Sequence, residues 1–190
     1  MRVTDPVVGE RPEPWSVPVV LHDPDPAWAE LFAADALAIR WVLRDRVLAV
    51  DHVGSTSVPG LPAKPILDIL LQVDDSADEG AYVPALESLG YWLQVREAGW
   101  LEHRVLYQRV ERGCPHDINL HVLSPGRAAE EIGRMLGLRN WLRSHPVDRE
   151  RYAAVKRELA RRRWRYVQDY ADAKTEVVEE ILVKVAQVRG

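Results

Sequence analysis

Cysteine and phenylalanine are almost absent from this chain of 190 residues, which contains one of each. A single cysteine, Cys114, excludes an internal disulfide and fits a reducing compartment, so we expect a cytoplasmic protein. The first 15 residues are charged and rich in proline, which is unlike a secretory signal. No apolar run reaches the roughly 20 residues that a membrane helix needs. We therefore expect no membrane association.

The chain also lacks an excess of basic residues, since 29 acidic side chains outnumber 25 lysines and arginines and the formal net charge is −4. Dedicated nucleic-acid-binding proteins are usually basic overall, so we do not expect that function. Apolar residues make up 47% of the chain, which is ample for a core. The length fits one domain over 17–190 behind a loose N-terminal arm over 1–16. Within that domain, 17–124 is rich in strands and 125–190 is helical.

Hydrophobic periodicity predicts the order of the elements. Helices are expected over 28–43, with Asp25-Pro26 as the start signal, and over 82–89. Strands are expected over 17–21, 47–53, 65–73 and 116–123, while 91–110 reads as strand and loop. The run 65–73 is almost continuously apolar, as in a strand covered on both faces. With three C-terminal helices near 127–144, 147–164 and 169–188, the pattern predicts an α/β protein with a mixed sheet and a helical block.

The segment His52-Val53-Gly54-Ser55-Thr56-Ser57-Val58-Pro59-Gly60-Leu61-Pro62-Ala63-Lys64 is the most informative part of the chain. Its Gly54-Ser55 turn follows a hydrophobic strand. Backbone donors and the hydroxyls of Ser55, Thr56 and Ser57 suit a phosphate or another oxyanion. Lys64 adds positive charge. The segment therefore predicts an anion-binding turn.

Asp68 follows this turn inside the apolar strand 65–73. A carboxylate next to a phosphate turn suits a divalent cation, and we expect Mg²⁺. Nucleotidyltransferases of the polymerase-β type carry a Gly-Ser turn and, about a dozen residues later, two strand carboxylates two positions apart. Here the second position is Leu70, so that carboxylate is missing. The competing interpretation is a structural turn and one strand aspartate held by backbone donors.

Asp117, Asn119 and His121 alternate along the strand over 116–123, so all three share one face. Asp117 could supply a further carboxylate for a metal. His121 could be a ligand or a general base. The alternative is a polar strand face that simply meets solvent.

These residues resemble the GrpB family. The likeness rests on the block from His52 to Asp68 and on pieces that agree in order and spacing, namely Asp25-Pro26-Ala27-Trp28, Asn119-Leu120-His121-Val122, Leu138-Arg139-Asn140-Trp141, Tyr152-Ala153-Ala154-Val155-Lys156 and Tyr170-Ala171-Asp172-Ala173-Lys174. The resemblance covers roughly 17 to 188. It implies a nucleotidyltransferase-like fold and a relation to a GrpB domain fused behind dephospho-CoA kinase. It implies Ser55 as the phosphate-turn serine and Asp68 as the first metal carboxylate, but no settled reaction.

The leading hypothesis is a protein that binds a nucleotide or another phosphorylated small molecule, with Mg²⁺-dependent nucleotidyl transfer to a small-molecule acceptor as its reaction. Asp68, with Asp117 or His121, would hold the metal. The ligand would be bound by Gly54, Ser55, Thr56, Ser57, Lys64 and Asn119, and by Arg139, Lys156 and Lys174 from the helical block. The alternatives are a non-catalytic module that binds a ligand or assists a partner enzyme, and an enzyme that uses His121 as a base on a non-nucleotide substrate.

Overall fold

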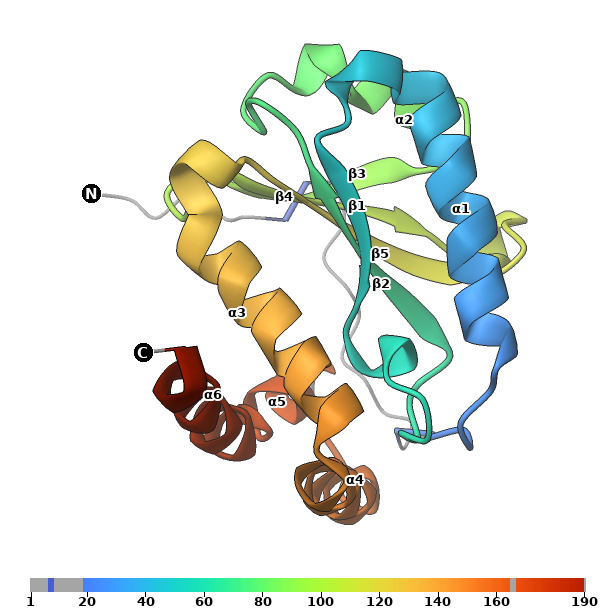
Figure 1. The fold of residues 1–190 in the computed structure, drawn as a ribbon. Helices are drawn as coiled ribbons and strands as arrows, with labels where there is room; N and C mark the ends of the chain where they lie inside the picture. Colours follow the sequence, from blue (N-terminus) through green and yellow to red (C-terminus); the bar gives the residue numbers. More distant parts are fainter. Residues whose placement is uncertain (1–6, 9–18, 165–166, 190) are drawn as a thin grey trace.

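A five-stranded mixed sheet forms the centre of the protein (Figure 1). The computed structural model describes residues 7–8, 19–164 and 167–189. The strands are β1 (Ala49–Val53), β2 (Ile66–Gln72), β3 (Trp92–Glu97), β4 (His103–Gln108) and β5 (Asp117–Leu123), in the spatial order β1-β2-β5-β4-β3. β2 and β5 are parallel neighbours, and the other pairs are antiparallel. The α/β class expected from the sequence is confirmed.

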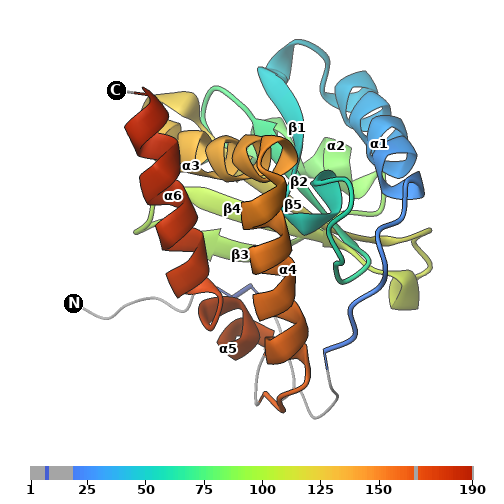
Figure 2. The same ribbon diagram turned by 60° about the horizontal axis from the view of Figure 1, so that its bottom comes forward.

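Helices cover both faces of this sheet (Figures 1 and 2). One face carries α1 (Ala27–Leu43) and α2 (Val83–Glu87). The other lies toward α3 (Pro125–Ser144), α4 (Pro146–Ala160), α5 (Val167–Asp172) and α6 (Thr175–Arg189). Short 3₁₀ turns occur at Arg44–Arg46, Ser55–Ser57, Glu79–Ala81 and Val110–Arg112. Within the described ranges, no helix is both long and apolar enough to cross a membrane.

Alternation along the two central strands separates the core from the site. The side chains directed toward α1 and α2 are apolar and buried: Leu67, Ile69 and Leu71 on β2, and Ile118, Leu120 and Val122 on β5. The intervening residues face α3–α6. There Leu70 and Leu123 pack against Ala128 and Ile132 of α3. β2 is therefore covered on both faces, as its composition predicts.

Most expected elements form, and the exceptions lie at the start of the chain and in the helical block. No strand forms over Val19–Leu21, and residues 17–18 lie outside the described ranges. Val19 instead packs against Leu159 and Tyr170, and His22, just after this segment, forms an isolated bridge with Ala63. Because its apolar side chain is buried against helices, this segment has no strand neighbour.

Two further boundaries differ from expectation. The helix expected over 169–188 is two helices, because the chain turns at 173–174 between α5 and α6. The helix expected over 147–164 ends at Ala160. Within the arm expected to be loose, Val7 bridges Val95 on β3, and the amide of Val8 donates to the Gln94 carbonyl; residues 1–6 and 9–16 lie outside the description.

Candidate functional site

The Gly54-Ser55 turn presses its backbone against Asp68. Gly54 has a φ of +66°, and a Cβ built on it would lie 2.2 Å from Oδ2 of Asp68. Only glycine permits both that conformation and that approach. Thr56 and Ser57 are buried, and both hydroxyls have partners within the protein. The Ser57 hydroxyl donates to the Gly54 carbonyl at 2.6 Å, and the Thr56 hydroxyl lies 3.0 Å from Nε2 of His52 on β1. These two hydroxyls maintain the turn and do not line the pocket.

Ser55, in contrast, lines a pocket of about 710 Å³ between the sheet and the helical block. Three lysines line the same pocket from different segments. Lys64 follows the turn, Lys156 comes from α4, and Lys174 lies between α5 and α6. The Tyr170 ring lies between two of them, with its centroid 5.8 Å from the Lys64 ammonium and 4.7 Å from that of Lys174. All three were expected at the site from the sequence, and the fold brings them together.

Burial makes these lysines unusual acids. Burial and the neighbouring Lys174 lower the pKa of Lys156 to about 7. Burial and Lys64 lower the pKa of Lys174 to about 8, and burial also lowers the pKa of Lys64. Asp68 is the carboxylate whose charge acts in the opposite direction on all three. The charge of Asp68 thus does not restore the usual pKa of any of the three lysines, and a further anion would favour their charged forms.

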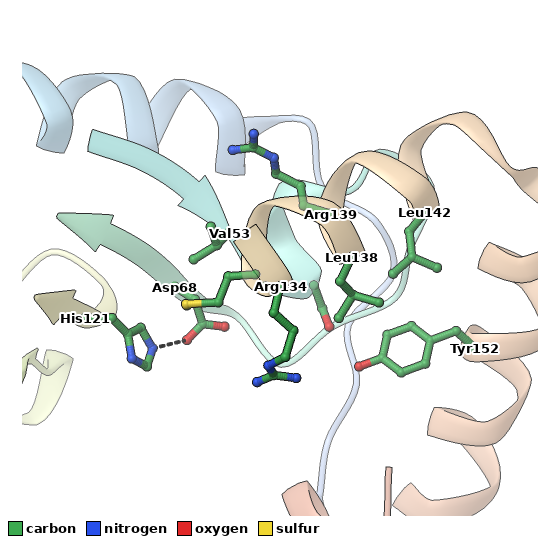
Figure 3. Close-up of a pocket in the computed structure, with 11 residues that line it drawn as sticks. Val53, Asp68, His121, Arg134, Leu138, Arg139, Leu142 and Tyr152 are labelled. Atoms are coloured by element: carbon green, nitrogen blue, oxygen red, sulfur yellow. Dashed lines mark ion pairs between the residues drawn. The ribbon is translucent and has the colours of Figure 1, made fainter. Parts of the chain in front are cut away.

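Asp68 lies at the centre of the site, where the parallel strands β2 and β5 place it beside Asn119. Nδ2 of Asn119 donates to Oδ1 of Asp68 at 2.8 Å, and Nε2 of His121 lies 3.7 Å from the same oxygen (Figure 3). Burial alone would raise the pKa of Asp68. The His121 imidazole, the Asn119 amide and the Lys64 ammonium outweigh that effect, so the pKa of Asp68 lies below its usual value.

A hydrogen-bonded chain leads from His121 across the sheet to β3. Nδ1 of His121 lies 3.1 Å from Nε2 of His103, and Nδ1 of His103 lies 2.7 Å from Oε2 of Glu97. Burial and the adjacent His121 lower the pKa of His103 to about 4, so this ring is neutral at neutral pH. A neutral His103 that donates from Nδ1 to Glu97 has an unprotonated Nε2. The proton between the rings then belongs to Nδ1 of His121, whose Nε2 faces Asp68.

No role in the site was predicted from the sequence for Glu97, His103 or Arg109. Arg109 packs 3.8 Å above the Tyr107 ring and donates to Oδ1 of Asn119 at 2.7 Å, which orients the amide toward Asp68. The signal was present as alternation in 103–108, where His103, Val105 and Tyr107 line the pocket. Its meaning depends on the pairing of β4 with β5, which brings this face beside Asn119 and His121 and which the sequence alone does not show.

Asp117 and Arg139 occupy structural positions. Oδ1 of Asp117 accepts from the amide of Val110 at 2.9 Å, and Asp117 does not line the lysine pocket. Arg139 donates to Asp51 at 3.1 Å and to the His52 carbonyl at 2.9 Å, so it fastens α3 to the strand before the turn. Its charge still borders a smaller pocket.

These donors do not fit a two-metal site. The residue beside Asp68 on the neighbouring strand is the amide Asn119, not a carboxylate, and its oxygen is already bonded to Arg109. Leu70, two positions after Asp68, is apolar and fully buried. Among the described residues, no three His, Cys, Asp or Glu side chains gather as a metal-binding group. Binding of Mg²⁺ by Asp68 or Asp117 stays a prediction, and the lysines are the charges in place for an anion.

The GrpB protein family model matches residues 18–184. The chain belongs to the GrpB family. A UPF0157 protein of Halalkalibacterium halodurans is 54% identical over 175 residues, which cover 92% of this chain and 86% of the relative. The crystal structure of the conserved protein GrpB from Enterococcus faecalis matches with a TM-score of 0.68 and 30% identity, over 85% of this chain and 98% of that one.

A more distant relative bears an enzyme name. The dephospho-CoA kinase of Mycolicibacterium paratuberculosis is 29% identical over 168 residues. The match covers 76% of this chain and 40% of the kinase. These likenesses confirm the expected family and its mixed α/β fold, while the reaction stays a matter for the site itself.

Proposed function

We propose that this GrpB protein binds a phosphorylated small molecule, nucleotides included, in the pocket lined by Lys64, Lys156 and Lys174. The observation that carries the proposal is the convergence of these lysines opposite the Gly54-Ser55 turn. The sequence has 25 lysines and arginines, of which four are lysine, and three of those four line this one pocket. A scattered surface charge would not concentrate the rarer cation in this way.

Electrostatics supports an anionic ligand over a neutral one. Bringing three ammonium groups into a partly buried space costs free energy through desolvation and mutual repulsion. A phosphate has several acceptor oxygens and multiple negative charge, so it offsets both costs at once. Nε2 of His121 and the Ser55 hydroxyl add hydrogen-bonding groups at the same wall.

The donor set favours binding, with or without acid–base chemistry, over two-metal nucleotidyl transfer. Leu70 occupies the place where that reaction needs its second carboxylate, and the residue that pairs with Asp68 on β5 is the amide Asn119. The non-catalytic or partner-assisting module is therefore the second candidate function. Incubation with ATP and a panel of small-molecule acceptors separates the two, because nucleotidyl transfer releases pyrophosphate and a binding module does not.

Thermal unfolding with pyrophosphate or ATP, in Mg²⁺ or in EDTA, tests the proposal. At about 100 times its dissociation constant a ligand adds about 2.7 kcal/mol to the stability, which raises Tm by several degrees. Lys174→Met should abolish the rise. Lys184→Met is the matched control, because the fourth lysine pairs with Asp148 outside the pocket. Absence of a shift with either ligand would contradict the proposal, and loss of any Mg²⁺-dependent increment in Asp68→Asn would place the metal at Asp68.

A further inference from the structure

A second, smaller pocket lies beside the lysine pocket. Ser55, Asp68 and His121 line both, so these three residues form a shared wall. The smaller pocket has a volume of about 220 Å³ and lies between the ends of β1 and β2 and the helix α3. Figure 3 shows Asp68 and His121 on one side of it and the helical residues on the other. We name it the α3 lobe and the larger pocket the lysine lobe.

The α3 lobe is apolar where the lysine lobe is charged. Met135, Leu138 and Leu142 line it from one face of α3, and Val53 and Tyr152 complete its walls. Their spacing of three and four residues along the helix places all three side chains on the same stripe. The lobe therefore offers apolar contact area next to a charged site.

Two arginines also border the α3 lobe, but their guanidinium groups already have partners. Arg139 bonds to Asp51 and to the His52 carbonyl. Arg134 makes a two-pronged ion pair with Glu131, at 2.7 and 2.9 Å. The groups suited to hold phosphate thus lie in the lysine lobe, and the α3 lobe is left for the uncharged part of a ligand.

We propose that the ligand is an organic phosphate whose compact apolar group fills the α3 lobe while its phosphate lies among the lysines. This inference rests on the proposed function and adds the substrate class and its orientation. The α3 lobe is smaller than the roughly 300–1,000 Å³ of pockets that hold drug-sized ligands, so it accepts a group of about one or two rings. The bond between that group and the phosphate then lies against the shared wall.

The shared wall carries the reactive side chains of the site. Nε2 of His121 faces Oδ1 of Asp68, and the hydrogen-bonded chain through His103 to Glu97 fixes the His121 ring. The charged and titratable groups around His121 are Asp68 on β2, Glu97 and His103 on β3 and β4, Glu131 and Arg134 on α3, and the three lysines across the lysine lobe. The proposed orientation therefore brings the linking oxygen of the ligand to the acid–base pair.

Calorimetric titration with phenyl phosphate, methyl phosphate and pyrophosphate tests this orientation. We expect the wild type to bind phenyl phosphate about tenfold more tightly than methyl phosphate, because the ring buries apolar area. Leu138→Trp fills the α3 lobe, so it should abolish that preference and leave pyrophosphate affinity within about twofold. Met135→Trp narrows the same lobe from one turn earlier and should act alike. Leu37→Trp, on the exposed face of α1, is the control.

The outcomes separate the two proposals. Equal affinity of the wild type for phenyl and methyl phosphate, or a preference that survives both tryptophan variants, would overturn the orientation while pyrophosphate binding upholds the proposed function. Failure of all three compounds to bind would overturn both. Circular dichroism and Tm of each variant establish that it folds, and one folded variant of the pair is enough for the comparison.

Discussion

The two faces of the sheet use the same strands for opposite purposes. Toward α1 and α2, the β5 residues Ile118, Leu120 and Val122 are completely buried in an apolar core. Toward the helical block, their neighbours Asn119 and His121 are partly exposed and bonded to charged or polar groups. One face belongs to a close-packed apolar core, and the other lines an open pocket in which three lysines gather. Stability is therefore concentrated on the first face, and the second carries groups that a stable fold does not need.

Truncating two adjacent residues of β5 that lie on opposite faces of the sheet tests this difference in stability most strongly. Leu120→Ala should cost about 4 kcal/mol of unfolding free energy, because a fully buried leucine leaves a cavity in a close-packed core. His121→Ala, one residue away, should cost about 1 kcal/mol or less. Urea denaturation of both variants measures the difference. Equal losses would mean that the site face carries as much of the stability as the core.

Gly54→Ala tests the one place where the site face is tightly packed. The new Cβ would meet Oδ2, Cγ and Cβ of Asp68 at 2.2, 2.9 and 2.8 Å, and it would also strain a backbone φ of +66°. We expect a loss of about 3 kcal/mol. In an Asp68→Gly background the clash disappears and only the backbone strain remains. The loss of stability caused by Gly54→Ala should then be smaller than in the wild type by at least about 1 kcal/mol. A loss that is unchanged in that background would refute the contact.

Lys156→Met should have the smallest effect and the opposite sign. Unfolded Lys156 keeps its usual pKa of 10.5, whereas burial holds the folded value at about 7. Between these values the unfolded chain binds more protons, so the wild type gains stability as pH rises from 7 to 10.5. The variant should be more stable than the wild type by about 1 kcal/mol at pH 7, because the lost hydrogen bond to the Pro62 carbonyl offsets part of the gain. Urea denaturation at pH 7 and 10 should show this gain shrink.

Period-two alternation is the reason that much of the site could be predicted. It placed Asn119 and His121 on one face of β5, and the apolar run around Asp68 identified a central strand. The parallel pairing of β2 and β5, which the sequence pattern did not predict, then places Asp68, Asn119 and His121 side by side. The Gly54 turn could also be predicted from the sequence, and the structure shows why glycine is needed there, because it lies against Asp68.

Side-chain direction inside turns and loops could not be predicted. A three-residue 3₁₀ turn sends successive hydroxyls in different directions, so Ser55 reaches the pocket while Thr56 and Ser57 bond internally. The boundary between α5 and α6, which delivers Lys174, has no proline or glycine to mark it. Arg109 and His103 act through Asn119 and His121 on β5, and the sequence pattern does not show that β4 is the strand that pairs with β5.

Proton-linked binding of pyrophosphate tests the central claim most directly. At pH 8 Lys156 is largely neutral and Lys174 about half neutral, given pKa values of about 7 and 8. An anion among the lysines favours their charged forms, so binding should take up about one proton. Calorimetric titrations in two buffers of different ionisation enthalpy count that proton, and the Lys156→Met, Lys174→Met double variant should lose both the binding and the uptake. Pyrophosphate that binds without proton uptake, and equally well to the double variant, would contradict the account.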